Sequence, residues 1–397
     1  MSSSWIALIL FCISLLVSLG IFPFVLRFAK RHNLVDNPNA RKLQRVPVPV
    51  IGGTAVLSGI AVSIIVAISV FHFHFLWVGL AAMFIMWIIG TWDDMKDIPA
   101  LFRFMVEVVL IWALITLTGT GIDHFHGVWG LQEITLYYSL PLSIVGGVGI
   151  INAINLMDGV DGYCSGFCVV ASIMFALAFF ASGNVAMGCF ALVCAGALLP
   201  FILHNVFGVR TKMFLGDGGS LMVGTAMTLM VYSVLSKDTM CSVLTDKGIG
   251  LGPFTLAVLA IPIFDTLRVM VVRIMRGRSP FHPDKTHLHH LFIEMGFSHA
   301  GTSVSIILIN LMIVAVWYVS YLLGASVDLQ LYIVLFLGFM ITFVFYRFMK
   351  IQQSFNDGEG TALYHWFCRV GAGTHIEGRG FWRWMRHLAD SVLNVRG

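Results

Sequence analysis

Four amide and carboxylate side chains lie close together in the stretch NAINLMDGVDG, residues 152–162. They are Asn152, Asn155, Asp158 and Asp161, and apolar runs over residues 137–151 and 167–180 flank the stretch. A carboxylate at the centre of a bilayer costs roughly 3 kcal/mol on insertion scales. Two of them in such surroundings indicate either the watery end of two membrane helices or a functional site.

Two further segments carry acids next to apolar runs. GTWDDMKDI, residues 90–98, contains Asp93, Asp94 and Asp97. If this segment is helical, Asp97 shares a face with each of the other two, and such like charges repel unless a cation or a shared proton intervenes. FLGDGGS, residues 214–220, sets Asp217 among glycines that would let a phosphate approach the backbone N–H groups of a helix start. Taken singly, the first pattern equally fits a solvated helix cap, and the second equally fits a glycine turn.

Two basic segments complete the set of polar stretches. NLVDNPNARKLQRVPVPVIGG, residues 33–53, is either a membrane-surface anchor or a phosphate site formed by Arg41, Lys42 and Arg45. RGRSPFHPDKTHLHH, residues 276–290, combines Arg276 with the clustered His287, His289 and His290. The spacing and the distance from any cysteine argue against zinc, and imidazoles suit hydrogen bonds to diphosphate or sugar hydroxyls.

The composition places these segments in a membrane protein. Of the 397 residues 58% are hydrophobic and only 11% are charged, whereas soluble domains carry about a quarter charged residues. An all-α integral membrane protein is therefore expected, with a membrane catalytic domain over residues 1–350 and a tail over 351–397. Residues 381–395 of the tail fit an interfacial helix or a disordered segment equally well. Apolar runs of spanning length lie at 5–29, 51–70, 76–92, 101–119, 136–155, 164–182, 185–206, 218–236, 250–274, 300–324 and 328–349, which makes eleven candidate helices.

Lysine and arginine predict the orientation. With the N-terminus outside, 22 of the 24 Lys and Arg residues fall on the cytoplasmic side, and only Lys237 and Lys247 fall outside. All the polar stretches then open onto the inner face, and the C-terminal tail is cytoplasmic. Acids from three segments that face one another require a divalent cation, and basic loops beside them suggest a substrate with phosphates. An enzyme that acts on a phosphorylated compound at the inner membrane surface follows.

Other ionisable groups were assigned to structure. Asp265 and Arg268, and likewise Arg103 and Glu107, have the spacing of ion pairs along a helix. His204 and Asn205 fit a structural or a functional role.

The motifs, in this order, resemble those of the polyprenyl-phosphate N-acetylhexosamine-1-phosphate transferase superfamily, and the histidine loop resembles that of its WecA-type members. The matching segments run from about residue 33 to residue 290: PNARK…PVPVIGG, DDMKD, NAINLMDGVDG, FLGDGGS and SPFHPDKTHLHH. The resemblance implies transfer of a sugar-1-phosphate, with UDP-GlcNAc as the favoured donor, to undecaprenyl phosphate with release of UMP. It further implies a bacterial inner membrane and a role in starting lipid-linked envelope glycans such as the O-antigen of lipopolysaccharide or cell-wall polymers.

The resemblance also implies residue roles. Asp217 is expected to be the principal ligand of Mg²⁺ or Mn²⁺, with Asn155 as its companion. Asp93 or Asp94 is expected to meet the lipid phosphate and to deprotonate it, with Asp97 tuning the pair. Asp158 and Asp161 are expected to hold uridine or to support the metal site from behind. Arg276, His287, His289 and His290 are expected to contact the sugar and the diphosphate, and Arg41 and Lys42 the lipid phosphate. Asn152 is also expected to bind substrate.

Two other classes of membrane protein fit the sequence less well. A secondary transporter would place ionisable residues near mid-membrane and often show internal repeats, but here the acids lie at helix ends and no repeat is visible. A zinc hydrolase lacks a ligand set. Within the superfamily, another UDP-N-acetylhexosamine or a MurNAc-pentapeptide donor stays open, as does a homodimer, and no nucleic-acid partner is expected.

Overall fold

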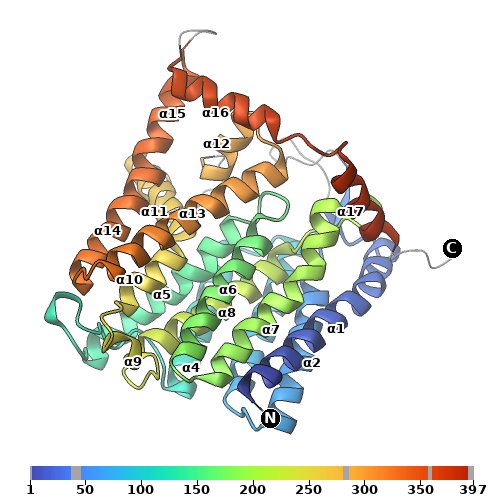
Figure 1. The fold of residues 1–397 in the computed structure, drawn as a ribbon. Helices are drawn as coiled ribbons and strands as arrows, with labels where there is room; N and C mark the ends of the chain where they lie inside the picture. The colour runs from blue at the N-terminus through green and yellow to red at the C-terminus, as the bar shows by residue number, and fades with distance from the viewer. Residues whose placement is uncertain (1, 37–45, 280–285, 356–359, 392–397) are drawn as a thin grey trace.

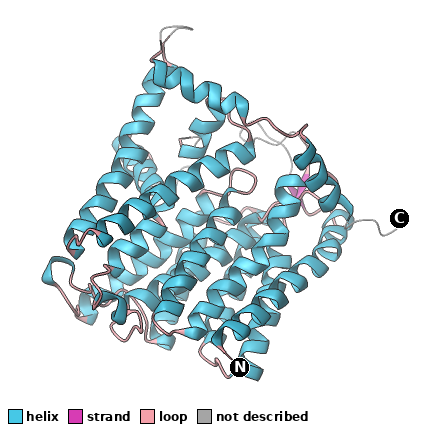
Figure 2. Cartoon of the chain, in the orientation of Figure 1, coloured by secondary structure: helices cyan, strands magenta, loops and turns pink. Residues whose placement is uncertain are grey.

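The computed structural model describes residues 2–36, 46–279, 286–355 and 360–391, and it is a bundle of membrane-length helices (Figures 1 and 2). In the described chain, ten helices are long and apolar enough to cross a bilayer, and a bent pair raises the number to at most eleven. The predicted all-α membrane architecture is confirmed, because each apolar run in the sequence corresponds to one of these helices.

The helices of the membrane-length segments are α1 (Ser3–Arg31), α2 (Gly53–Phe71), α3 (Leu76–Lys96), α4 (Ala100–Thr118), α5 (Leu136–Leu156), α6 (Tyr163–Ala181), α7 (Val185–Ile202), α8 (Gly216–Leu235), α13 (His299–Leu322) and α14 (Val327–Phe339), together with the bent pair α10 (Leu251–Val258) and α11 (Ala260–Met275). The short helices are η1 (Val128–Gly130), α9 (Ser242–Thr245), α12 (Leu288–Glu294), α15 (Tyr346–Gln353), α16 (Ala362–Gly373) and α17 (Gly380–Ser391). Two π-helical turns, η2 (Leu203–Phe207) and η3 (Met340–Phe345), extend α7 and α14. The antiparallel pair β1 (Val35–Asp36) and β2 (Val48–Pro49) flanks the first basic loop.

Helix α8 forms the centre of the bundle. In the 18-residue apolar stretch of α8, 94% of the residues are buried inside the protein. In the corresponding stretch of α4, at the periphery, 22% are buried. Helices α2, α3 and α5 pack around α8. Asp217 lies in the first turn of this central helix, so its position is fixed by packing on several sides.

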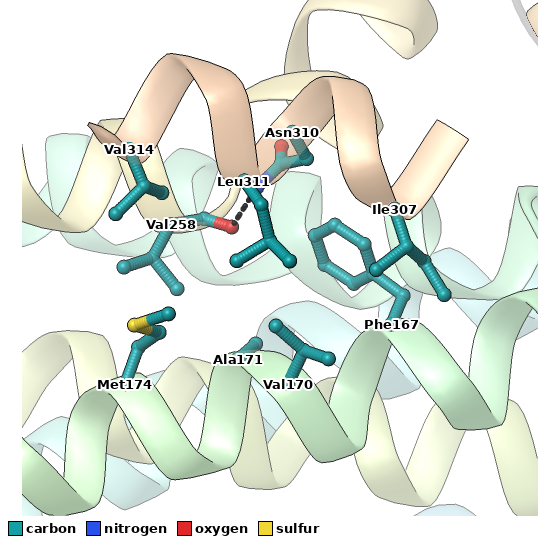
Figure 3. Close-up of a pocket in the computed structure, with 9 residues that line it drawn as sticks. All are labelled: Phe167, Val170, Ala171, Met174, Val258, Ile307, Asn310, Leu311 and Val314. Carbon is teal, nitrogen blue, oxygen red and sulfur yellow. Dashed lines mark hydrogen bonds between the residues drawn. The ribbon is translucent and has the colours of Figure 1, made fainter. Parts of the chain in front are cut away.

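The ninth apolar run is bent by 75° between α10 and α11. Asn310 on α13 satisfies the backbone at the bend: its Oδ1 accepts the N–H of Ile261 at 2.9 Å, and its Nδ2 donates to the carbonyls of Ala257 (3.3 Å) and Val258 (3.0 Å). Figure 3 shows Asn310 pointing at Val258 among apolar side chains of α6 and α13. A break in a membrane helix persists when neighbouring side chains re-satisfy the freed backbone groups in this way.

The loops gather at two ends of the bundle. The site end carries the segments 32–36, 46–52, 97–99, 157–162, 208–215, 276–279 and 286–298, and the far end carries 72–75, 119–135, 182–184, 236–250 and 323–326 (Figure 1). At the site end Lys30 Nζ donates to the carbonyl of Arg210 at 2.8 Å. At the far end the N–H of Lys237 donates to Asp123 at 2.7 Å. The polar stretches predicted to share one face therefore lie at one end.

The tail after α15 forms two helices rather than an irregular chain. Trp382 and Ala389 of α17 are buried against the bundle, whereas Phe381, Trp384 and Leu388 are exposed on the other side of that helix. The tail thus packs on the site end through one face and presents aromatic residues outward through another.

Candidate active site

The two predicted metal ligands lie side by side. Asn155, in the last turn of α5, places its Nδ2 at 2.7 Å from Asp217 Oδ1 and at 2.9 Å from Ser220 Oγ. The Asp217 side chain is 39% exposed, so it opens to solvent at the site end. Rotation of the Asn155 amide about its terminal bond would present its oxygen to the same place.

Asp94 fixes the start of α8. Its two oxygens accept the backbone N–H groups of Asp217 (2.9 Å) and Gly218 (3.2 Å). A carboxylate at this place also complements the positive end of the helix dipole. The N–H groups that the sequence suggested for a phosphate are therefore used by Asp94, and Asp94, Asn155 and Asp217 meet at one place.

Glycines on α2 and α3 allow the backbones of these helices to touch the FLGDGGS segment at the start of α8. A Cβ added to Gly90 on α3 would lie 2.4 Å from the carbonyl oxygen of Asp217, and one added to Gly53 on α2 would lie 2.4 Å from the Cα of Gly219. Small residues let membrane helices approach this closely. These glycines thus position Asp217 by packing α2 and α3 directly against α8.

Arg103 links the acidic segment of α3 to Asp217, one of the predicted metal ligands. Its Nη1 lies 2.9 Å from Asp93 Oδ2 and 4.0 Å from Asp217 Oδ2, and its Nε lies 3.6 Å from Glu107. The predicted ion pair with Glu107 exists, and the same guanidinium also faces the site. Buried Glu107 in turn accepts a hydrogen bond from the amide of Asn152.

The three acids of DDMKD occupy different places. Asp93 Oδ2 accepts a hydrogen bond from Arg103, and Asp93 Oδ1 accepts one from the N–H of Ile98 at 2.9 Å. Helix α3 ends at Lys96, and Asp97 follows in a left-handed conformation with φ of 47° and an exposed side chain. The helical face that Asp97 was expected to share therefore ends before it.

Two acids in the loop between α5 and α6 have opposite surroundings. Burial tends to raise the pKa of Asp161, but hydrogen bonds and positive charge from His299 and Lys212 outweigh it and hold the pKa below its ordinary value. Lys212 Nζ lies 2.6 Å and His299 Nδ1 3.1 Å from Asp161 Oδ2. Burial, and then the negative charges of Asp217 and Asp94, raise the pKa of Asp158 well above its ordinary value.

The carboxylates around Asp217 suit a hard divalent cation. Burial is the main cause of the raised pKa of Asp158, the charges of Asp217 and Asp94 add to it, and a cation beside these acids would relieve the repulsion among them. Over the described ranges, no three His, Cys, Asp or Glu side chains form a closed metal cage. Mg²⁺ is commonly held by one or two carboxylates, with water and substrate phosphates completing its shell. Asp217 with Asn155 fits such an open site, and a closed structural zinc site does not.

A buried ion pair anchors the histidine segment. Asp265 Oδ1 lies 2.7 Å from Arg268 Nη2, and Oδ2 lies 2.9 Å from His287 Nδ1. The N–H of Leu288 donates to both oxygens at 3.1 Å. The pair predicted to be structural is structural, and it ties the start of α12 to α11.

The histidine segment packs against the loop that carries Asp158 and Asp161. The rings of His287 and His289 are 5.7 Å apart, and a Cβ on Gly159 would lie 2.8 Å from His289 Nε2. Burial, and then the neighbouring His290, lower the pKa of His289 well below its ordinary value, so the ring is neutral. Nε2 of His287 is buried without a hydrogen-bond partner within the described ranges. Such an unpaired donor or acceptor suits contact with a ligand.

We expect Asp265→Asn to destabilise the fold. It removes the charge opposite Arg268, which is only 3% exposed, and breaking a buried pair in this way costs about 3 kcal/mol. Thermal unfolding in detergent measures the effect as a lowered melting temperature. Glu133→Gln, which breaks the exposed pair between Glu133 and Lys237 at the far end, is the control and should leave the melting temperature unchanged. Equal melting temperatures in the two variants would contradict the anchoring role of Asp265.

The remaining predicted substrate contacts are less defined. Arg276 is exposed just beyond the end of α11. Arg41 and Lys42 lie outside the described residues, so their expected contact with a lipid phosphate stays a prediction. The strand that follows their loop reaches the site, because the N–H of Phe214 donates to the carbonyl of Pro49 at 2.7 Å.

Several site residues were missed in the sequence. Lys212 and His299 are the partners of Asp161, and no local spacing pointed to either. Asn205, left open by the sequence, joins two site segments: its Oδ1 accepts the N–H of Gly162 at 2.7 Å, and its Nδ2 donates to the carbonyl of Met213 at 2.9 Å. Its neighbour His204 is buried and stacks on Phe22 with ring centroids 3.9 Å apart.

The sequence of this chain is similar to those of known proteins. Residues 76–235 match the family model described as Glycosyl transferase family 4. The chain is 32% identical over 309 residues, 75% of this chain and 79% of the relative, to the undecaprenyl-phosphate alpha-N-acetylglucosaminyl 1-phosphate transferase of Escherichia coli K12. It is 30% identical over 296 residues, 72% and 77% respectively, to the protein of the same description from Yersinia pestis. It is 27% identical over 343 residues, 86% and 89%, to a probable undecaprenyl-phosphate N-acetylglucosaminyl 1-phosphate transferase of Bacillus subtilis.

Proposed function

The chain belongs to glycosyl transferase family 4, and from this premise we propose that it transfers N-acetylglucosamine-1-phosphate from UDP-GlcNAc to undecaprenyl phosphate and releases UMP. The observation that carries the proposal is the convergence of Asp94, Asn155 and Asp217 at one end of a membrane bundle. An acceptor with a lipid tail arrives within the bilayer and a nucleotide sugar arrives from water. A site at the end of the helices is accessible to both.

Asp217 and Asn155 would hold Mg²⁺ or Mn²⁺, which would neutralise the negative charge of the donor diphosphate. Around them, Asp94 holds the Asp217 backbone in place and Arg103 adds a positive charge on the same side. An oxygen of the acceptor phosphate attacks the phosphorus bonded to the sugar, and the bond from that phosphorus to UMP breaks. One phosphoanhydride replaces another, so catalysis consists mainly of positioning and charge neutralisation.

The histidine segment and the loop below it are proposed to hold the donor. Asp161 remains ionised between Lys212 and His299, which keeps the loop backbone in one place. The unpaired Nε2 of His287 can accept a hydrogen bond from a sugar hydroxyl, because Nδ1 of that ring donates to Asp265, and the exposed Arg276 can donate to the diphosphate. His289 is neutral and packs against the loop at Gly159, so it shapes the pocket and donates a hydrogen bond rather than a charge.

The presence of an apolar cavity of about 640 Å³ supports the proposal that the acceptor is a polyprenyl phosphate. It lies between α4, α5, α8 and the bent pair α10–α11, and reaches from Asn152 near the site to Phe125 and Trp129 at the far end. Its walls are almost wholly apolar, with Val148, Ile263 and Leu267 among them. Such a cavity suits a long hydrocarbon chain whose phosphate lies at the site.

Gly149→Leu tests this assignment of the cavity. Gly149 lines the cavity, and an added Cβ would meet nothing within 4 Å, so the larger side chain enters the cavity without straining the helix. The KM for undecaprenyl phosphate should rise about tenfold, the equivalent of roughly 1.4 kcal/mol of lost apolar contact. The KM for a short-chain polyprenyl phosphate should not change. Gly20→Leu, at an equally open position on α1, is the control. An unchanged KM for the long-chain acceptor would remove the cavity from the acceptor site.

The distribution of charge supports an orientation with the site in the cytoplasm. Twenty-two of 24 Lys and Arg residues lie on the predicted inner segments. We propose a bacterial inner membrane location with the N-terminus outside and the C-terminal tail cytoplasmic. The product would start a lipid-linked envelope glycan.

A two-substrate assay tests the proposal. Detergent-purified protein receives polyprenyl phosphate and radiolabelled UDP-sugars, and UMP and an extractable labelled lipid are measured. UDP-GlcNAc is expected to give both products, EDTA to abolish them, and added Mg²⁺ or Mn²⁺ to restore them. A preference for another UDP-N-acetylhexosamine or for a UDP-MurNAc-pentapeptide would show that this compound, and not UDP-GlcNAc, is the donor. The absence of product with every donor would overturn the proposal.

A further inference from the structure

The end of the chain returns across the site end. Residues 360–391, which include α16 and α17, are referred to here as the strap. Figure 1 shows α16 above α12 and α17 beside the site end of α7. Among the contacts of the strap with the rest of the chain, those at Thr211 and at Ser298 each lie one residue away from a partner of Asp161.

The first anchor is Asp390 on α17. Its Oδ1 accepts the backbone N–H groups of Val209 (3.2 Å), Arg210 (3.1 Å) and Thr211 (3.2 Å), and the hydroxyl of Thr211 at 3.0 Å. Hydrogen bonds to an ionised acceptor are stronger than neutral ones, and four of them hold a short loop firmly. The next residue after this loop is Lys212, whose Nζ lies 2.6 Å from Asp161.

Trp382 supports the first anchor. It is buried on the same helix, and its ring lies 4.6 Å from that of Phe207, just before the held loop. Helix α17 therefore contacts the segment before Lys212 both through an apolar ring and through a carboxylate.

The second anchor is Thr374 at the end of α16. Its Oγ1 accepts the N–H of Ser298 at 2.9 Å, and its carbonyl accepts the Ser298 hydroxyl at 3.0 Å. A Cβ added to Gly301 would lie 2.4 Å from the Thr374 side chain, so the two segments are in close contact. The residue after Ser298 is His299, whose Nδ1 lies 3.1 Å from Asp161.

From these contacts we infer that the strap is a positioning device for the donor site. It braces Lys212 from one side and His299 from the other, and both side chains hold the carboxylate of Asp161. The loop 157–162 is thereby kept against the histidine segment. This inference rests on the proposed function only in naming the donor as the substrate that the loop receives.

Kinetics on the full-length protein test the role of the strap. Asp390→Ala and Thr374→Ala should each raise the KM for UDP-GlcNAc about tenfold, because the loop is displaced, while kcat and the KM for the acceptor change little. Thr374→Ser keeps the hydroxyl and should restore the wild-type KM. Asp328→Ala removes the same kind of contact, a carboxylate accepting the N–H of Trp129 at 2.6 Å, but at the far end, and should leave the KM for UDP-GlcNAc unchanged.

Coupling to Asp161 separates positioning from general stability. In an Asp161→Asn background, where the two ion pairs are already lost, adding Asp390→Ala should raise the donor KM no further. If the two substitutions instead multiply their separate effects, the strap does not act through Asp161 and the inference is wrong.

Hydrogen exchange tests the inference without the reaction. Asp390→Ala should speed amide exchange in residues 158–162 as well as in 209–212, and exchange confined to 209–212 would overturn the coupling. Asp390→Asn, which keeps the shape of the side chain, is expected to act in the same direction and replaces the alanine variant if that protein does not fold. A wild-type protein without transfer activity would refute the proposed function alone, because the exchange result still decides the role of the strap.

Discussion

Asp217→Asn is expected to lower UMP release about 10³-fold while the protein folds as the wild type does. The substitution keeps the shape of the side chain and removes the charge that would hold the cation. Charge stabilisation of a phosphoryl-transfer transition state by a metal ion is worth several kcal/mol, and each 1.36 kcal/mol is about a tenfold change in rate. The side chain is 39% exposed, so the variant leaves no buried polar group unpaired. UMP release at saturating UDP-GlcNAc and Mg²⁺, together with thermal unfolding, measures both effects.

The same substitution at the far end provides the control. Asp246→Asn changes an exposed carboxylate outside the site and should retain full activity. Removal of the Asp217 charge also relieves its repulsion of Asp158, so the cation-free variant should unfold at the wild-type temperature or above it. Turnover near the wild-type rate would exclude Asp217 from the metal site.

Gly90→Ala is expected to destabilise the protein and to abolish transfer. The added Cβ would lie 2.4 Å from the carbonyl of Asp217 and 2.5 Å from the N–H nitrogen of Gly218, which are backbone atoms that no rotamer change can move. Overpacking costs about 1–3 kcal/mol and more where backbones must separate. A shift of Asp217 by about 1 Å would by itself reduce the rate about 10²-fold. Thermal unfolding followed by tryptophan fluorescence, and UMP release from the folded fraction, measure the two effects.

Gly20→Ala is the matched control for Gly90→Ala. Gly20 is also in a membrane helix, but a Cβ there would meet nothing within 4 Å, so stability and activity should be retained. If Gly90→Ala melts and turns over like Gly20→Ala, the close crossing of α3 and α8 does not position Asp217.

Much of the fold could be predicted from the sequence because the bilayer restricts the possibilities. A spanning helix needs about 20 apolar residues, and the eleven predicted runs correspond to the ten helices of spanning length and the bent pair found in the described residues. The 75° bend could not be predicted, since the hydrogen bonds that satisfy it come from Asn310, about 50 positions further along the chain. The two helices of the tail were equally undecided, because their contacts with Thr211 and Ser298 are also distant in sequence.

The members of the candidate site were visible, and their partners were not. Acids next to apolar runs are conspicuous because placing a charge beside lipid costs free energy. Asp94, Asn155 and Asp217 do meet in the structure. Arg103 could be read only as the partner of Glu107, because its distance from Asp217 depends on how α4 and α8 are rotated. The glycines of FLGDGGS are equally compatible with an anion site and with a helix crossing until Gly90 and Gly53 are placed against them.

Asp94, Asn155 and Asp217 come from distant parts of the chain and meet at one place, which we propose to be a single cation site. Titration of the purified protein with Mn²⁺ in the presence of UDP-GlcNAc, followed by electron paramagnetic resonance, measures that site directly. The wild type is expected to bind a single Mn²⁺ per chain at its site, and Asp217→Asn is expected to lose this binding. Equal binding of Mn²⁺ by the wild type and by Asp217→Asn would contradict the assignment.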